Sequence, residues 1–236
     1  MAHFRRHETT TSSLSYTFPP RTTIVGMIAA ILGYEKDSYY KLFNTEKCRI
    51  ALQIKNRIKH ITQTLNYLMT KEVSLKRLRG IGRPTQIHTD LLLADNDNLS
   101  ELSYRIFFNH EDETMQRQLE ESIINRKFYY PPSLGSANNL ARLEYIDTIK
   151  AEIFRPEGEI EVHTIIPKSA LKNLNSQQDR RICIEDIVPA DFNADRRLLR
   201  TETYIYEISG KKINASLNLN AFRYKINGED VIGVFM

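Results

Sequence analysis

Residue types that bind phosphate and stack on bases gather at the start of the chain. Segment 3–7 combines imidazole and guanidinium groups, and a tyrosine and a further arginine follow before the first apolar run. Cations can bind backbone phosphates, and aromatic rings can stack on the bases of a single-stranded nucleic acid. The alternative is an ordinary basic N-terminus. The candidate binding residues are His3, Arg5, Arg6, His7, Tyr16 and Arg21.

A helix is predicted over residues 22–33, directly after these residues. The pair Pro19-Pro20 holds extended backbone and excludes helix up to that point. Thr22 or Thr23 can cap the free N–H groups of the helix, and Gly33 marks its end. Because a helix N-terminus attracts anions, this start beside arginines and hydroxyls is a suitable place for a phosphate.

A second group of cations lies within one segment. Residues 55–83 hold eight lysines and arginines against one acid, although the net charge of the whole chain is only +4. Such a local surplus indicates a polyanionic partner, and interleaved polar and aromatic residues favour RNA; the alternative is a solvated loop. Segment 57–83 is too long for an ordinary loop, so we expect a projecting β-hairpin, or thumb. Its candidates are Arg57, Lys59, His60, Lys76, Arg77, Arg79 and Arg83.

A third candidate is the loop 131–139, which is rich in Pro, Gly, Ser and Asn. Gly135 permits close approach of the backbone to a ligand. The backbone N–H groups and the Ser136 hydroxyl could then bind an anion. A plain turn is the alternative, because one glycine is a weak signal.

An ordered set of short motifs connects these segments. The motifs are Ala2-His3-Phe4-Arg5, Ser15-Tyr16, Pro19-Pro20-Arg21-Thr22, Gly26 through Gly33, Pro84-Thr85-Gln86 and Pro132-Ser133-Leu134-Gly135. With this set the chain resembles the CRISPR-associated Cas5 family, and most closely its type I-B variant. The resemblance covers residues 1–150 well and the remainder loosely. No single motif is specific, but their order is fairly specific.

The resemblance implies a function and partners. Cas5 proteins are RNA-binding subunits, of the RAMP superfamily, in type I CRISPR surveillance complexes (Cascade). They hold the 5′ handle of the guide RNA (crRNA) and join the large subunit to the backbone subunits; target DNA is met indirectly, through the complex. The loop 131–139 corresponds to a glycine-bearing loop that touches RNA. A thumb in this family folds over kinked RNA. The resemblance implies the same role for four residues taken together, Lys76, Arg77, Arg79 and Arg83.

The start of the chain departs from the family pattern. Members usually begin with an apolar strand before the Ala-His-Phe step, whereas here Met1 directly precedes Ala2. We therefore expect that the chain begins at an internal methionine or has lost its first strand.

The periodicity of the chain predicts an α+β fold. With a first strand supplied upstream, the element order is β-α-β-β-α-β, the ferredoxin-like or RNA-recognition pattern. Beyond residue 155 the composition changes and strand signals dominate, with no helix of comparable strength. The expected elements of the first part are helices at 22–33 and 110–126 and strands at 48–55, 86–93, 101–108 and 140–154.

Two domains follow from this pattern. Residues 1–155 are expected to form the RNA-recognition-like domain, with its basic thumb at 57–83. Residues 156–236 are expected to form a smaller β-rich subdomain, whose apolar and aromatic surface would, by the resemblance, contact other subunits.

Catalysis is the main alternative to a binding role. Metal-free RNA cleavage needs a base, an acid and a cation, and relatives in type I-C systems process precursor RNA with a Tyr, Lys and His set. No Lys-His pair lies in the strand at 101–108, so the set is incomplete and no catalytic residue is assigned. If the protein were such a nuclease, the residues for catalysis would be Tyr39, Tyr40, Lys41, His60, His88 and His110.

A stand-alone regulatory protein of RNA-recognition type is a second alternative.

Composition limits the remaining classes. The 236 residues can bury a sizeable core, and Cys48 and Cys183 show no metal or redox spacing, as in a reduced cytoplasmic protein. The longest apolar run, 24–32, is too short for a membrane span. No metal-ligand motif and no nucleotide-binding glycine loop occurs. We therefore expect a cytoplasmic protein without metal, cofactor or membrane partner.

Overall fold

The computed structural model describes residues 1–9, 12–67, 75–81, 85–95, 101–175, 179–226 and 228–236. This part is mostly β-structure. The helices are α1 (Arg21–Leu32), α2 (Leu75–Leu78) and α3 (Glu113–Ile124), with a 3₁₀ turn at Lys168–Ala170. The strands are β1 (Phe4–Arg5), β2 (Ser15–Tyr16), β3 (Cys48–Ile54), β4 (Ile58–Tyr67), β5 (Thr85–Ala94), β6 (Tyr104–His110), β7 (Glu152–Phe154), β8 (Glu159–Val162), β9 (Ile166–Pro167), β10 (Leu171–Leu174), β11 (Ile182–Phe192), β12 (Leu198–Glu207), β13 (Ile213–Leu217), β14 (Ala221–Ile226) and β15 (Glu229–Gly233).

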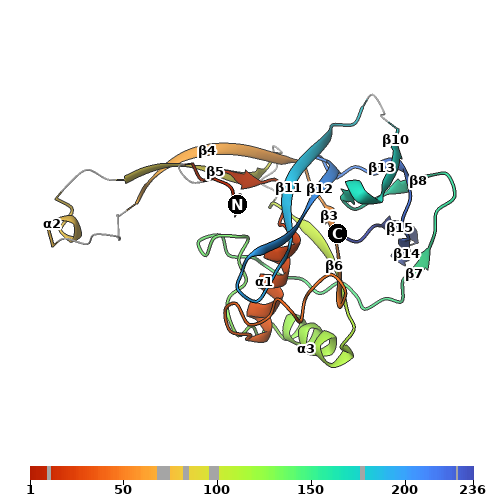
Figure 1. Cartoon of the computed structure of the whole chain (residues 1–236), viewed down its shortest axis with the longest axis horizontal. Helices are drawn as coiled ribbons and strands as arrows, with labels where there is room; N and C mark the ends of the chain where they lie inside the picture. The colour runs from red at the N-terminus through yellow and green to blue at the C-terminus, as the bar shows by residue number, and fades with distance from the viewer. Residues whose placement is uncertain (10–11, 68–74, 82–84, 96–100, 176–178, 227) are drawn as a thin grey trace.

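A long antiparallel hairpin projects from the body of the molecule (Figure 1). Strands β4 and β5 pair without a break from Ile58↔Ala94 to Tyr67↔Thr85, and α2 lies at the far end. We call β4, α2 and β5 the arm. The sequence placed a hairpin at 57–83, but the return strand is 85–94, so the basic segment supplies only the outgoing strand and the tip.

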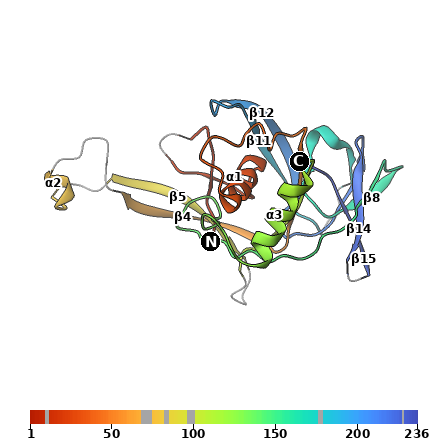
Figure 2. The ribbon, with the colours of Figure 1, turned by 90° about the horizontal axis from the view of Figure 1, so that it is seen from below.

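The pair β3–β6 lies at the centre of the body. Its register runs from Cys48↔His110 to Ile54↔Tyr104, and β3 is buried along nearly its whole length. In the described part of the chain, β6 pairs with no strand other than β3. Helices α1 and α3 lie side by side (Figure 2) and pack into the same core. The elements α1, β3, β6 and α3 therefore follow one another in the predicted order, with the arm inserted between the two strands.

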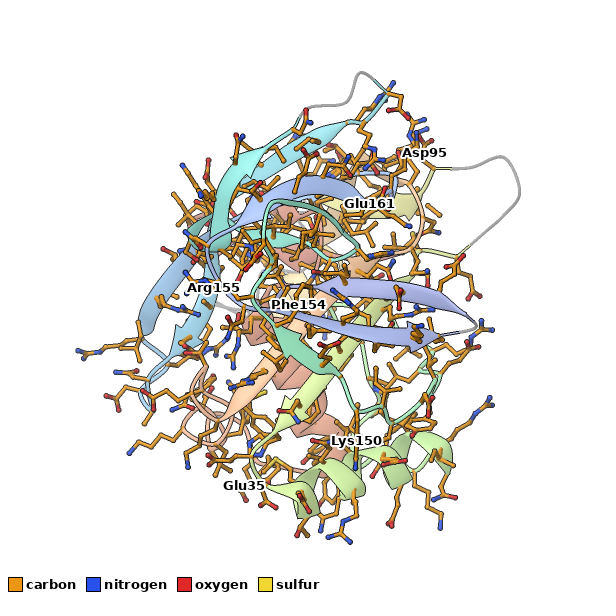
Figure 3. The ribbon with its side chains drawn as sticks, turned by 90° about the vertical axis from the view of Figure 1, so that its right-hand side faces the viewer. Glu35, Asp95, Lys150, Phe154, Arg155 and Glu161 are labelled. Carbon is orange, nitrogen blue, oxygen red and sulfur yellow. The ribbon has the colours of Figure 1, made fainter. Side chains whose placement is uncertain are left out.

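Three small antiparallel sheets make up most of the chain after residue 150. Their strand orders are β10-β13-β8, β11-β12-β9 and β15-β14-β7. Figure 3 shows β7, ending at Phe154, beside β14 and β15. The largest apolar core contains Val188, Tyr204 and Tyr206 together with residues of α1 and β3. Both predicted domains thus contribute to one core, and a boundary at residue 155 stays a prediction.

Helix α1 begins one residue earlier than predicted, and the expected threonine cap is wrong. Pro20 occupies the N-cap position, and no side chain caps the helix. The Pro20 carbonyl accepts hydrogen bonds from the N–H groups of Thr23 (2.9 Å) and Ile24 (3.1 Å). Thr22 and Thr23 are already inside the first turn, so their hydroxyls cannot serve as its cap. The predicted end at Gly33 is confirmed, since Gly33 takes the left-handed conformation there (φ 82°).

The predicted strand at 140–154 is wrong for most of its length, because only Glu152–Phe154 forms a ladder. Side chains from Leu140 to Tyr145 alternate between exposed and half-buried, as in a strand. Alternation alone does not make a strand, because the backbone also needs a neighbouring edge with which to pair. In the described structure this stretch has only one bridge, Leu140 with Ser133.

Candidate nucleic-acid interface

Two of the three predicted segments meet in space. The His3 N–H donates to the carbonyl of Leu134 (3.1 Å), and His3 forms a parallel bridge with Gly135. Gly135 has φ 88°, and a Cβ built on it would overlap the carbonyl oxygen of His3. A glycine is therefore required for the loop 131–139 to lie against the N-terminal segment. Ser136 is half-buried and accepts a hydrogen bond from the side-chain amide of Asn139 (2.9 Å).

His3 positions the N-terminal segment, and its predicted contact with RNA stays a prediction. The side chain is buried, with 8% exposed. Its Nδ1 donates to the carbonyl oxygen of Asp90 (2.7 Å), and its Nε2 lies 2.9 Å from the hydroxyl of Ser13. With both ring nitrogens engaged, the imidazole ties the N-terminal segment to the base of the arm.

Tyr16 is also buried, so its ring is not accessible to a base in the free protein, and the predicted stacking stays a prediction. Only 1% of the residue is exposed. Its hydroxyl donates to the carbonyl of Ile187 (2.9 Å), and the guanidinium of Arg6 lies 4.9 Å from the ring centroid. Arg6 also pairs with Glu185. The basic residues of this segment that are exposed are Arg5 and His7.

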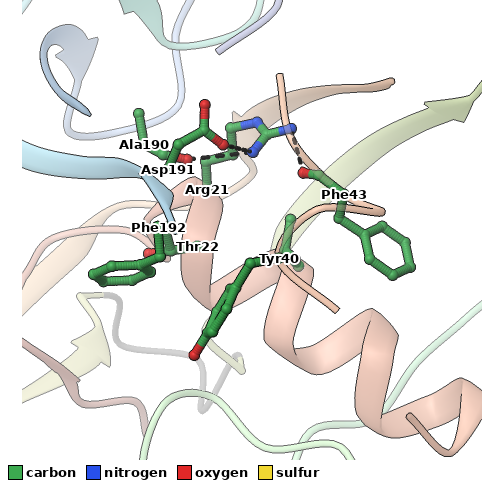
Figure 4. A pocket seen from close by; sticks show the side chains of 8 residues that line it. Arg21, Thr22, Tyr40, Phe43, Ala190, Asp191 and Phe192 are labelled. Carbon is green, nitrogen blue, oxygen red and sulfur yellow. Dashed lines mark hydrogen bonds and ion pairs between the residues drawn. The ribbon is translucent and has the colours of Figure 1, made fainter. Parts of the chain in front are cut away.

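Arg21 has a structural role in the free protein, and its predicted contact with phosphate stays a prediction. Only 1% of it is exposed. One terminal nitrogen donates to Asp191 Oδ1 (2.8 Å) and the Ala190 carbonyl (3.2 Å), and the other donates to the carbonyls of Phe43 (2.9 Å) and Cys48 (2.8 Å). Burial lowers the pKa of this guanidinium, and Asp191 opposes that shift. Figure 4 shows Asp191, Ala190 and Phe43 converging on it beside a small pocket.

A polar hub fixes the base of the arm to the body. We define it as Thr17, His60, Asp90 and Glu185. His60 Nδ1 lies 2.9 Å from Asp90 Oδ2 and its Nε2 lies 3.1 Å from the Thr17 hydroxyl. That hydroxyl donates to Glu185 (3.1 Å) and accepts from the Tyr206 hydroxyl (3.0 Å). The hub links β4, β5, the segment after β2, and β11, so the predicted RNA-binding residue His60 has both ring nitrogens occupied.

The other cations of the basic segment are spread along the arm. Lys59 is exposed near the base, where the half-exposed Arg57 pairs with Asp95 (2.8 Å). Lys76 lies within α2 and Arg79 directly follows it; both are exposed, and α2 lies at the far end of the arm (Figure 1). Arg83 and the side chain of Arg77 lie outside the described residues. The arm is therefore a spaced series of cations, suited to following a backbone of phosphates.

The candidate catalytic residues are divided between the body and the arm in the described structure. Burial raises the pKa of both Tyr39 and Tyr40, which makes them poor bases near neutral pH. His110 is buried; its Nε2 donates to the Leu42 carbonyl (2.8 Å) and its Nδ1 accepts from the Asp112 N–H (3.0 Å). His60 belongs to the hub and His88 lies on the arm. Lys41 is exposed.

The two acids of the hub were missed by the sequence analysis. Asp90 lies within the Leu-rich end of β5, and Glu185 is only 4% exposed within β11. A charged residue at an inward position of a strand must have a partner, because burying an unpaired charge is costly. That inconsistency with the apolar pattern is the signal that could have found them.

The described residues also bear on two other kinds of feature, membrane-spanning helices and metal sites. They contain no helix long and apolar enough to cross a membrane. Nor do they bring three His, Cys, Asp or Glu side chains together in a way that could hold a metal ion.

Comparison with known proteins gives a fold and a family. A crystal structure of a CRISPR protein from Archaeoglobus fulgidus shares the fold, with a TM-score of 0.53 and 18% identity over 98% of this chain and 93% of that one. A CRISPR RNA-guided surveillance complex contains a chain that matches with a TM-score of 0.47 and 13% identity over 91% of this chain and 87% of that one. No curated protein matches the sequence.

A family model decides the class of protein. The model described as CRISPR-associated protein (Cas_Cas5) matches residues 1–206. The chain therefore belongs to the CRISPR-associated Cas5 family.

Proposed function

We propose that this protein is a non-catalytic RNA-binding subunit of a type I CRISPR surveillance complex, where it caps the 5′ handle of the crRNA. Family membership supports a CRISPR-associated role. The observation that carries the RNA-binding role is the arm, a projecting series of exposed cations. In this role the unit α1-β3-β6-α3 belongs to a ferredoxin-like, RNA-recognition-type domain within residues 1–155, and the arm is its thumb.

The RNA contacts in this proposal come from exposed residues and from the half-buried Arg6 and Ser136. Along the arm they are Arg57, Lys59, Lys76 and Arg79, and Arg77 and Arg83 remain part of the proposal from sequence. At the base they are Arg5 and His7, with Arg6, and the exposed backbone of Gly135 beside Ser136. The buried His3, Tyr16 and Arg21 support this surface from within, and the exposed His60 supports it through the hub.

The protein partners follow from the same proposal. As the cap at the 5′ end of the crRNA, the protein lies between the first backbone subunit and the large subunit. Its association with target DNA is indirect, through the complex. Exposed apolar side chains in the β-rich part fit a protein interface. Examples are Ile153, Ile184, Ile187 and Leu219.

Binding without cleavage is the expected result with CRISPR repeat RNA. End-labelled repeat RNA is incubated with the protein in EDTA and run on matched native and denaturing gels. A shift without a cut supports the handle cap. A discrete metal-independent cut would replace it with the processing nuclease, and the candidate tyrosines and histidines would then be mutated. Stable monomeric behaviour in the presence of the other subunits would favour a stand-alone regulator.

Neutralising the arm should change how RNA binding depends on salt. In the variant Lys59→Ala/Lys76→Ala/Arg79→Ala, the slope of log K against log salt should fall by about 2, because each lost contact with a single-strand phosphate contributes about 0.7. The control Lys150→Ala/Lys168→Ala/Lys172→Ala removes three exposed charges elsewhere and should leave the slope unchanged. An equal slope in the wild type and the arm variant would mean that the arm does not contact RNA.

A further inference from the structure

A second basic projection lies at the turn between β11 and β12, far from the arm in sequence. The turn carries Arg196 and Arg197, and Arg200 follows at the start of β12. Asn193 fixes the turn: its side-chain oxygen accepts from the N–H groups of Asp195 (3.0 Å) and Arg197 (2.7 Å). We call residues 193–200 the basic turn.

The three guanidinium groups of the basic turn face solvent. The side chains of Arg196 and Arg200 are 60% and 46% exposed, and Arg197 is exposed as well. Each guanidinium has five N–H donors in a fixed fork, which suits a phosphate group.

The nearest acids do not satisfy these arginines. Asp37 lies 4.0 Å from Arg196 Nε, but the same oxygen already accepts from the Tyr40 hydroxyl at 2.6 Å. Asp191 lies 4.0 Å from Arg200 Nε, but it bonds Arg21 at 2.8 Å through one oxygen and Thr45 at 2.8 Å through the other. Asp195 within the turn is the remaining nearby acid. The basic turn therefore keeps a positive surplus with free donors.

The identity of residue 196 is not explained by the turn itself. Arg196 has φ 59°, a left-handed conformation that glycine or asparagine adopts more easily. The side chain is exposed, and among the described residues its one ion pair is the long one with Asp37. An arginine at this position costs conformational energy, and a ligand for its guanidinium would offset that cost.

We propose that the basic turn is a second nucleic-acid contact, which binds backbone phosphates separately from the arm. It lies beside α1 and away from the α2 end of the arm (Figure 1, Figure 2), and Phe192 and Asp191 at its base are seen in Figure 4. The chemistry fits two sources, the guide RNA and a DNA duplex, whose major groove admits a two-stranded β-ribbon. This inference depends on the proposed function in one respect: both require that the protein binds nucleic acid.

The test measures binding to a labelled single-stranded RNA and to a DNA duplex of equal length over a salt series. In Arg196→Ala/Arg197→Ala/Arg200→Ala the slope of log K against log salt should fall by about 2 on RNA or by about 3 on the duplex. The ligand whose slope changes is the source. The lysine control variant should match the wild type on both.

A conservative variant guards against a folding effect. Arg196→Lys/Arg197→Lys/Arg200→Lys keeps the charge but loses the bidentate fork, so the slope should stay and the affinity should fall. Circular dichroism confirms that each variant is folded. Equal slopes for the wild type and the alanine variant on both ligands would overturn the proposal, as would a wild type that binds neither ligand.

The proposed function can fail separately from this inference. If the arm variant lowers the salt slope on RNA and the basic-turn variant changes neither slope, only the proposal for the basic turn is wrong. If the wild type binds the duplex through the basic turn but binds no RNA, the proposed handle-capping function is wrong and the proposal for the basic turn is supported.

Discussion

The guanidinium of Arg21 connects the first turn of α1 to β3 and β11 through the carbonyls and the carboxylate that surround it. Removing one partner of a buried charge pair leaves the other uncompensated, at a cost of about 3–5 kcal/mol. Arg21→Met should therefore lower the free energy of unfolding by about that amount, as measured by urea denaturation. Its effect on RNA binding should follow only from loss of folded protein.

The opposite pattern would support a direct role for Arg21. A variant with an unchanged urea midpoint and weakened RNA binding would mean that the guanidinium meets phosphate in the complex. Val25→Ala, on the same helix and also buried, serves as the control for general destabilisation.

Gly135 offers a test of the contact between the loop and the N-terminal segment. An alanine there would take a strained positive φ, costing about 1–3 kcal/mol, and its Cβ would also overlap the His3 carbonyl. Gly158 has nearly the same φ, 85°, with nothing near its Cβ position. Gly135→Ala should thus lower the melting temperature more than Gly158→Ala, and equal losses would mean that the close approach to His3 is unimportant.

Sequence reasoning found the right residue types but not their exposure. His3, Tyr16 and Arg21 were selected because their side chains can bind RNA, and all three are buried in the structure. Their burial depends on Asp90, Ile187 and Asp191, which lie far away in the chain. Such long-range partners leave no local pattern in the sequence. Residue type alone therefore could not distinguish residues that support the fold from residues that are exposed to RNA.

At the scale of the element, α3 shows how a cap creates a dependence on pH. Asp112 accepts from the N–H groups of Met115 and Thr114, and these bonds lower the pKa of its carboxyl below the usual 3.8. The folded state therefore holds the proton of Asp112 less tightly than the unfolded state does. The contribution of this cap to the stability of the protein is complete above pH 3.8 and is lost as the pH falls below it.

The cap can be tested without breaking the helix. Asp112→Asn keeps a good N-cap but removes the titrating group, so its stability should vary less with pH between 4 and 2 than that of the wild type. Asp112→Ala should be less stable at neutral pH. Parallel stability curves for wild type and Asp112→Asn below pH 4 would contradict this account.

Local pattern predicted the central elements well. The strands at 48–54 and 104–110 and the helix at 113–124 lie within a few residues of their predicted places, because strong period-2 or period-3.6 signals mark them. Beyond the bridge of Leu140 with Ser133, the stretch 140–151 has the signal but pairs with no strand in the described structure. The hairpin was expected, but its return strand was misplaced because the basic charge ends before Thr85.

At the scale of the whole molecule, the hub decides how the arm is held. The Thr17 hydroxyl contacts His60, Glu185 and Tyr206 at once, so removing it takes a partner from two buried groups, the Glu185 carboxylate and the Tyr206 hydroxyl. Such a loss costs about 1–3 kcal/mol. Thr17→Val keeps the shape of the side chain and leaves every surface cation in place.

Thr17→Val should therefore separate the orientation of the arm from its charge. RNA affinity should fall, because a loosened arm loses more conformational entropy on binding, while the slope of log K against log salt should stay at the wild-type value. Hydrogen exchange of β4 and β5 should become faster in the free protein. Thr64→Val, which removes an exposed hydroxyl 3.0 Å from His88 on the same arm, should change none of these quantities. If Thr17→Val lowered the slope as the arm variant does, the hub would be part of the phosphate-binding surface; if affinity and exchange were both unchanged, the arm would be held by its strand pairing alone.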